Sequence, residues 1–195
     1  MENNARERTE DDMGETEKRN IDRLLEMVVY VASESRGDER FALTKLYKIL
    51  FFADFDYFAK HGRSITGADY VSLPYGPAPA QMKRAIKELK ASGRLTVVPV
   101  MFHGKNQKVP VSQVDADLSQ FSGDEVATMA RAIKSFWNKS ATDLSLLSHQ
   151  FPGWIIADNG REIPYSLALV GPARKTLHKV RKAKGLDSVA EKYVD

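Results

Sequence analysis

The chain of 195 residues contains no cysteine and no long apolar run. Without thiols it can form neither a disulfide nor a thiolate metal site. Its N-terminus lacks the apolar stretch that a secretory signal needs. The most apolar segment is interrupted by charged residues, whereas a membrane span needs roughly 20 consecutive apolar residues. We therefore expect a cytoplasmic protein that does not enter a membrane.

The sequence also lacks the short motifs of the common enzyme classes. It has no Gly-rich loop ending in Gly-Lys-Ser/Thr, no His-Glu-x-x-His and no Gly-x-Ser-x-Gly. The histidines at positions 61, 103, 149 and 178 lack the spacing of metal ligands. We expect no catalytic residue, no cofactor and no metal site, and we interpret His149 as a hydrogen-bonded structural residue.

Composition divides the chain into three parts. Residues 1–16 are charged and polar with almost nothing to bury, which predicts a disordered tail. Residues 17–170 have the helical periodicity of one compact, mainly α domain with a small peripheral β-hairpin. Residues 171–195 form a basic extension, predicted to be helical, with a run of basic side chains between Arg174 and Lys184.

A strongly apolar stretch between Thr44 and Gly62 predicts a buried helix. Leucine, isoleucine and tyrosine recur at three- and four-residue steps, and phenylalanines fill most of the remaining circumference. Thr44 is expected to cap its start through the hydroxyl group. Asp54 and Asp56 point about 200° apart on a helix, so we interpret them as helix-edge or salt-bridge residues rather than a catalytic pair.

A loop stiffened by proline follows this helix. Residues 72–79 read Ser-Leu-Pro-Tyr-Gly-Pro-Ala-Pro. Each proline fixes its own φ angle and restricts the preceding residue, so the loop has little conformational freedom to lose on binding. Preorganisation of this kind favours recognition, and Tyr75, Gly76 and Pro77 are our first candidate partner-binding residues.

A basic helix is predicted after this loop. It runs from just after Pro79 to about Ala91, and its outer face carries Lys83, Arg84 and Lys87. A charge run of this kind is usually a solvated face. The functional alternative is a docking surface for an acidic partner or for phosphates, so these three residues complete the candidate set.

Two short strands, at residues 95–102 and 107–113, are predicted to form the peripheral hairpin. Pro99 and Pro110 cannot donate hydrogen bonds to a ladder, which restricts these strands to sheet edges. A basic helix followed by a hairpin is also the order found in winged-helix modules. A DNA-binding regulator is therefore an alternative function, with nucleic acid as its partner.

Capping signals mark the starts of two later helices. Ser122 with Glu125, and Ser140 with Asp143, have the spacing of capping boxes and precede apolar faces that should close the core. Trp154 follows a Pro-Gly turn and is predicted to be a core residue, because tryptophan is usually largely buried.

Three of these segments resemble one family, the Panacea domain of SocA-like antitoxins and GepA-like phage-associated proteins. Residues 44–53 are similar to its Thr-x-x-Lys-Leu-x-Lys-Leu-Leu-Tyr-Phe-Ala type helix, and residues 75–79 to its Tyr-Gly-Pro-Val-Pro type loop. Residues 140–149, followed by Trp154, are similar to its Ser-Ala-x-x-Leu-Ser-x-Leu-(Ser/Thr)-His helix. The loop departs from the family pattern in carrying Ala78 where a larger apolar residue is usual.

The resemblance covers residues 20–160 and implies a mainly helical domain with a small β element. It also implies an antitoxin of a toxin-antitoxin system that neutralises a cognate protein toxin by direct protein-protein contact, without enzymatic activity of its own. An adaptor that delivers its partner to a protease is a further alternative.

Overall fold

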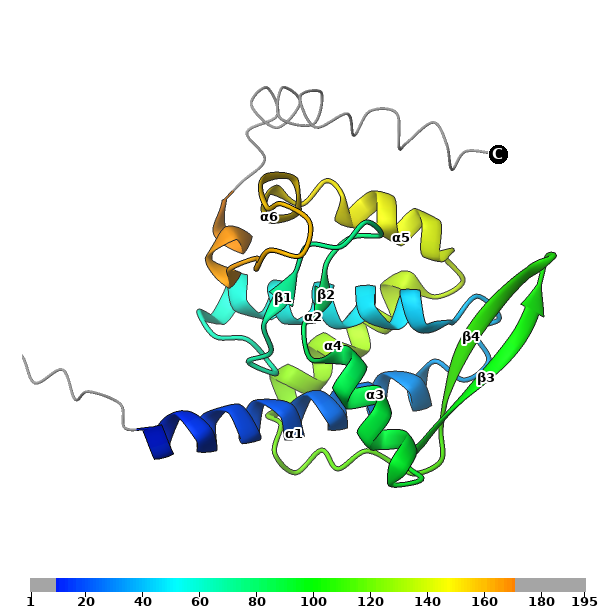
Figure 1. Cartoon of the computed structure of the whole chain (residues 1–195), viewed down its shortest axis with the longest axis horizontal. Coiled ribbons are helices and arrows are strands. Elements are labelled where there is room, and N and C mark those ends of the chain that lie inside the picture. Colours follow the sequence, from blue (N-terminus) through cyan, green and yellow to red (C-terminus); the bar gives the residue numbers. More distant parts are fainter. Residues whose placement is uncertain (1–9, 171–195) are drawn as a thin grey trace, which may run out of the picture.

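The computed structural model describes residues 10–170, and Figure 1 shows how their helices and strands are arranged. The helices are α1 (Glu10–Glu34), α2 (Leu43–His61), α3 (Met82–Ala91), α4 (Gly123–Phe136), α5 (Ala141–Ser148), α6 (Pro152–Ile156) and the 3-10 helix η1 (Tyr165–Leu169). The strands form two antiparallel pairs, β1 (Tyr70–Val71) with β2 (Ala78–Pro79) and β3 (Leu95–Phe102) with β4 (Lys105–Ser112). The predicted mainly α fold is confirmed. No helix within residues 10–170 combines the length and the apolar character needed to cross a bilayer.

Helix α2 runs through the middle of the fold, with other elements on every side (Figure 1). The ring of Phe55 lies 4.5 Å from that of Phe51 and 4.7 Å from that of Tyr165, between centroids. The predicted burial of this helix is confirmed. The predicted cap is wrong, because α2 begins at Leu43 and Thr44 already lies inside its first turn. The N-cap is Ala42, which makes no side-chain capping bond.

Helix α1 begins at Glu10, inside the segment 1–16 that was predicted to be a disordered tail. The apolar residues from Ile21 onward are buried against the core and hold this helix in place. Extending an existing helix costs far less than starting one, so α1 continues toward its N-terminus even through weak helix formers such as Asp12 and Gly14. The predicted disordered tail is therefore wrong from Glu10 onward. Residues 1–9 and the predicted basic extension at 171–195 lie outside the described residues.

A buried ion pair fixes the turn between α1 and α2. The Lys45 Nζ atom lies 2.5 Å from Asp38 Oδ2 and donates a second hydrogen bond, of 2.9 Å, to the carbonyl oxygen of Lys139. The backbone N–H of Arg40 donates to Asp38 Oδ1 at 3.0 Å. One lysine of α2 thereby joins the α1–α2 turn to the turn between α4 and α5.

The hairpin of β3 and β4 extends away from the helices (Figure 1). Its turn contains two residues, His103 and Gly104, with φ angles of 46° and 74°. Positive φ at both positions gives a turn whose twist matches that of the strands. β4 consequently begins at Lys105, two residues earlier than the predicted start at residue 107.

The predicted helix starts are confirmed in the second half of the chain. The Glu125 N–H donates to Ser122 Oγ at 3.3 Å, and the Ser122 N–H donates back to Glu125 Oε2 at 2.7 Å. Ser140 and Asp143 make the same reciprocal pair at the start of α5. Trp154 is buried in the core, also as predicted.

Candidate partner-binding site

The candidate loop joins β1 to β2 and turns tightly at its tip. The Gly76 N–H donates to the carbonyl oxygen of Leu73 at 2.8 Å, which closes a β-turn with Pro74 at its second position. The indole N–H of Trp154 donates to the same carbonyl oxygen at 2.9 Å. The loop is therefore held both by its own turn and by α6.

The loop contains both exposed and buried candidate residues. Tyr75 is 62% exposed, whereas Gly76 and Pro77 are buried. A partner can touch the Tyr75 ring directly. Gly76 and Pro77 instead shape the backbone that presents this ring, so we regard them as positioning residues.

Gly76 passes close to two polar side chains beneath the loop. Its φ angle is +95°, in the region that favours glycine. A Cβ atom at this position would lie 2.2 Å from Ser148 Oγ and 2.6 Å from Lys48 Nζ. Glycine is therefore required both by the backbone angle and by the space available.

Lys48 of α2 supports the loop from below. Its side chain is buried, and its Nζ atom donates to the carbonyl oxygen of Pro77 at 3.0 Å. Burial disfavours the charged ammonium and lowers the pKa of Lys48 to about 7. Lys48 was not among the predicted site residues, because in the sequence it is only one of the charged residues that interrupt the apolar stretch. Its position among apolar neighbours was the available signal.

A serine beside a lysine of low pKa also occurs in some nucleophilic active sites. Here Ser148 is 0% exposed, and its hydroxyl donates to the carbonyl oxygen of Ser145 at 2.8 Å. A substrate has no access to this hydroxyl, so the arrangement serves to position the loop. No group of three His, Asp or Glu side chains gathers to hold a metal ion within residues 10–170.

The stability of the protein is expected to rise with pH because of Lys48. The pKa of Lys48 is about 7 in the folded chain, compared with 10.5 for a solvent-exposed lysine such as that of the unfolded chain. Between these values the unfolded chain binds a proton that the folded chain does not, so the free energy of unfolding increases with pH. We expect Lys48 to contribute a gain of about 2 kcal/mol between about pH 7.5 and about pH 9.

Urea denaturation of the wild type and of Lys48→Met at a series of pH values measures this contribution. The difference between the two curves isolates Lys48, because the other titrating groups are common to both proteins. Parallel pH curves for the two proteins would show that Lys48 is protonated alike in the folded and the unfolded chain.

A small apolar pocket of about 200 Å³ lies beside the exposed tyrosine. It is lined by Thr44, Pro74, Tyr75, Ala141, Thr142, Ser145, Leu146 and His149. Small-molecule sites usually occupy about 300 Å³ or more, so this pocket suits a single side chain of a partner.

His149 is buried and stacks on Trp154, with ring centroids 3.8 Å apart, which supports its predicted structural role.

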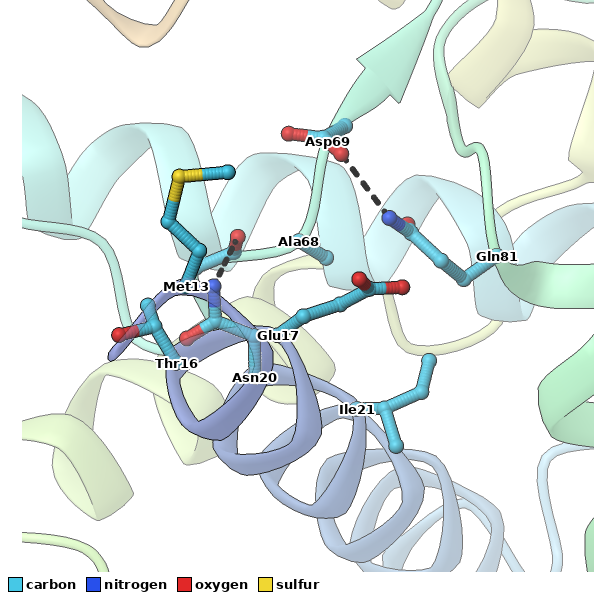
Figure 2. A pocket seen from close by; sticks show the side chains of 9 residues that line it. Met13, Thr16, Glu17, Asn20, Ile21, Ala68, Asp69 and Gln81 are labelled. Atoms are coloured by element: carbon cyan, nitrogen blue, oxygen red, sulfur yellow. Dashed lines mark hydrogen bonds between the residues drawn. The ribbon is translucent and has the colours of Figure 1, made fainter. Parts of the chain in front are cut away.

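A second pocket, of about 240 Å³, lies between α1 and the segment before β1 (Figure 2). The Asn20 side chain donates to the carbonyl oxygen of Gly67 at 3.0 Å, and the Gln81 amide donates to Asp69 Oδ2 at 3.0 Å. Figure 2 shows the side chains of Gln81 and Asp69 facing one another, with Asn20 on α1 at the other side of the pocket. The first bond fastens α1 to the chain that enters β1, and the second joins the start of α3 to the same segment. We assign no ligand to this pocket.

The basic candidate residues lie on another part of the fold. Lys83, Arg84 and Lys87 are exposed on α3, as predicted for its outer face. α3 lies beside α1 and the base of β3, whereas the tip of the loop with Tyr75 lies beside α5 (Figure 1). The structure therefore divides the candidate set into two separate surfaces.

The family model described as "Antitoxin SocA-like, Panacea domain" matches residues 46–155, which is more than half of the 195 residues. This segment includes the loop, α3, the hairpin, α4 and α5. No curated protein and no solved structure matches the chain. The match over most of α2 through α6 shows that the chain belongs to the SocA-like antitoxin, Panacea domain family.

Proposed function

We propose that this protein is an antitoxin that neutralises a cognate protein toxin by binding it directly. The observation that carries the proposal is the family match over residues 46–155. The mechanism is stoichiometric: the bound antitoxin covers the active site or the target-binding surface of the toxin. The protein itself turns over no substrate.

The geometry of the loop supports capture by a surface that is already in shape. Leu73 and Pro77 each use their carbonyl oxygen to accept a bond from a buried side chain, Trp154 Nε1 and Lys48 Nζ respectively. A backbone held in this way loses little entropy on binding. Stable complexes bury about 800 Å² on each partner, so the loop must act together with other surfaces.

Co-expression tests the proposed function. The chain is produced together with the toxic product of an adjacent reading frame, and growth is compared with that of cells making the toxic product alone. We expect growth to be restored and the two proteins to co-purify in a fixed ratio. Absence of both growth rescue and a complex would contradict the proposal.

The amount of toxin distinguishes direct neutralisation from delivery to a protease. Under direct neutralisation the toxin level stays constant when the antitoxin is present. Under delivery the toxin level falls, and it recovers when the protease is inhibited. Quantitative immunoblotting of the same cultures measures this difference.

A further inference from the structure

The register of the hairpin sorts its side chains into two faces. Thr96 is paired with Val111 and Val98 with Val109. Side chains of paired residues lie on the same face, and alternate residues along each strand share it. One face, which we name the outward face, consists of Thr96, Val98, Val100, Phe102, Lys105, Gln107, Val109 and Val111.

The opposite face attaches the hairpin to the helices at its base. There Leu95, Pro110 and Ser112 are buried, and Val97 packs against the core. Within residues 10–170 the hydrophobic core contains no valine of the outward face.

The middle of the outward face is apolar, and its valines are wholly or partly exposed to solvent. Val98 and Val100 are 42% and 40% exposed, and Val109 and Val111 are partly exposed beside them on β4. Single exposed apolar residues are common, whereas apolar side chains grouped on one face offer a patch that a partner can cover. The hairpin therefore presents a face that is suited to contact with another protein.

Two prolines favour contact through the face rather than through an edge. Pro99 on β3 is paired with Lys108, and Pro110 on β4 is paired with Val97. A proline has no N–H to donate to the neighbouring strand, so both prolines occupy non-hydrogen-bonded pairs. In such a pair the backbone polar groups point away from the partner strand, toward the outer edges of the hairpin. Each outer edge of the hairpin therefore lacks one backbone N–H group at its proline, which hinders the addition of a further strand.

The charges around this face specify the chemistry of the partner. The hairpin, residues 95–112, contains no acidic side chain. Lys105 lies on the outward face, and Lys108, paired with Pro99, lies on the opposite face of the same hairpin. The neighbouring α3 adds the exposed Lys83 and Lys87. A complementary surface would be apolar at its centre and acidic at its border.

The area of the face argues against a second copy of this chain as the occupant. Strands of this length form a face of roughly 26 Å by 10 Å. Two such faces packed together fall well short of the about 800 Å² that each partner buries in a stable complex. A partner that also covers α3 can reach that area.

We propose that the outward face of the hairpin is the surface on which the toxin docks, through an apolar toxin surface bordered by acidic groups. This inference depends on the antitoxin function proposed above. It transfers the main contact from Tyr75 to β3 and β4, and it gives the predicted Lys83 and Lys87 a place at the border of the interface.

A double variant with a matched control tests the inference. Val98→Lys combined with Val100→Lys puts charges on the outward face. Met101→Lys puts a charge on the opposite face of the same strand, where the side chain is 64% exposed. We expect the dissociation constant for the purified toxin to rise more than about 30-fold in the double variant. Met101→Lys should leave it within about threefold of wild type.

Amide hydrogen exchange of the wild-type complex provides a second measurement that needs no variant. We expect slower exchange across residues 95–112 when the toxin is bound. Circular dichroism of both variants checks that the fold is retained, as it should be for substitutions at exposed positions.

The outcomes separate this inference from the proposed function. Toxin binding that survives the double variant, or hairpin exchange that is unchanged in the complex, would overturn the inference and leave the antitoxin function standing. Equal losses in Met101→Lys and the double variant would also overturn it. A wild-type dimer, or duplex DNA binding, that the double variant abolishes would assign the face to another occupant. A wild type that neutralises no toxin would overturn both proposals.

Discussion

Replacing Asp54 with alanine is expected to lower the free energy of unfolding by about 4 kcal/mol. The Asp54 carboxylate is fully buried in α2. It accepts hydrogen bonds from the backbone N–H groups of Ile65 and Thr66, at 2.8 and 2.9 Å, and from the hydroxyls of Thr66 and Tyr70, at 2.6 and 2.8 Å. Alanine would leave all of these donors without an acceptor inside the core. Chemical denaturation monitored by circular dichroism measures the loss.

Asp56→Ala is the matched control on the same helix. Asp56 is exposed, and among residues 10–170 its ion pair is with Lys60, one turn away, at 2.6 Å. Exposed pairs of this kind contribute little, so we expect a change of at most about 0.5 kcal/mol. Similar losses in the two variants would mean that the network around Asp54 does not carry the stability assigned to it.

These two aspartates show what helical periodicity can and cannot predict. The two-residue spacing correctly separated them, and the predicted salt bridge is present at Asp56. Periodicity could not show that Asp54 is buried, because its donors come from residues 65–70, after the helix has ended. The burial of a charged side chain depends on such partners, which a pattern along one helix does not contain.

The same limit explains the buried lysines. Lys45 and Lys48 fit into α2 because their ammonium groups reach the carbonyl oxygens of Lys139 and Pro77. The acceptor for Lys45 lies 94 residues away in the sequence. Local signals such as the capping box at Ser122 need no distant partner, and they were predicted correctly.

The outward face of the hairpin was not predicted for a related reason. The sequence of β3, Leu-Thr-Val-Val-Pro-Val-Met-Phe, is apolar on both faces. Alternation therefore could not show which face packs on the helices. The distinction follows only from the pairing register and from the burial of Leu95 and Ser112 at the base.

The candidate loop was predicted more completely, because proline and glycine act locally. The stiff turn through Pro74 and Gly76 is present as the sequence indicated. Which side chains the turn exposes depends on α2 and α5 beneath it, so the burial of Gly76 and Pro77 was not visible in the sequence. The conformational restrictions of proline and glycine predicted the shape of the loop, whereas its orientation depends on the contacts with α2 and α5.

Replacing Gly76 with alanine is expected to cost about 3 to 4 kcal/mol of stability and to weaken toxin binding. Part of the cost, about 1 to 2 kcal/mol, comes from a positive φ angle at a residue with a Cβ atom. The rest comes from the contacts of that atom with Ser148 Oγ and Lys48 Nζ, because one of these groups must move. Displacement of Lys48 would also release the carbonyl oxygen of Pro77 and shift the loop that presents Tyr75.

Gly37→Ala separates these two contributions. Gly37 has a similar φ angle of +88°, but a Cβ atom there would meet no other atom within 4 Å. We expect this control to lose only the about 1 to 2 kcal/mol of backbone strain and to bind the toxin as the wild type does. Denaturation curves and toxin titrations of both variants provide the comparison. Equal losses of stability would show that the space beneath Gly76 can accept a methyl group, and the loop would then not depend on the contact with Lys48 and Ser148 for its shape.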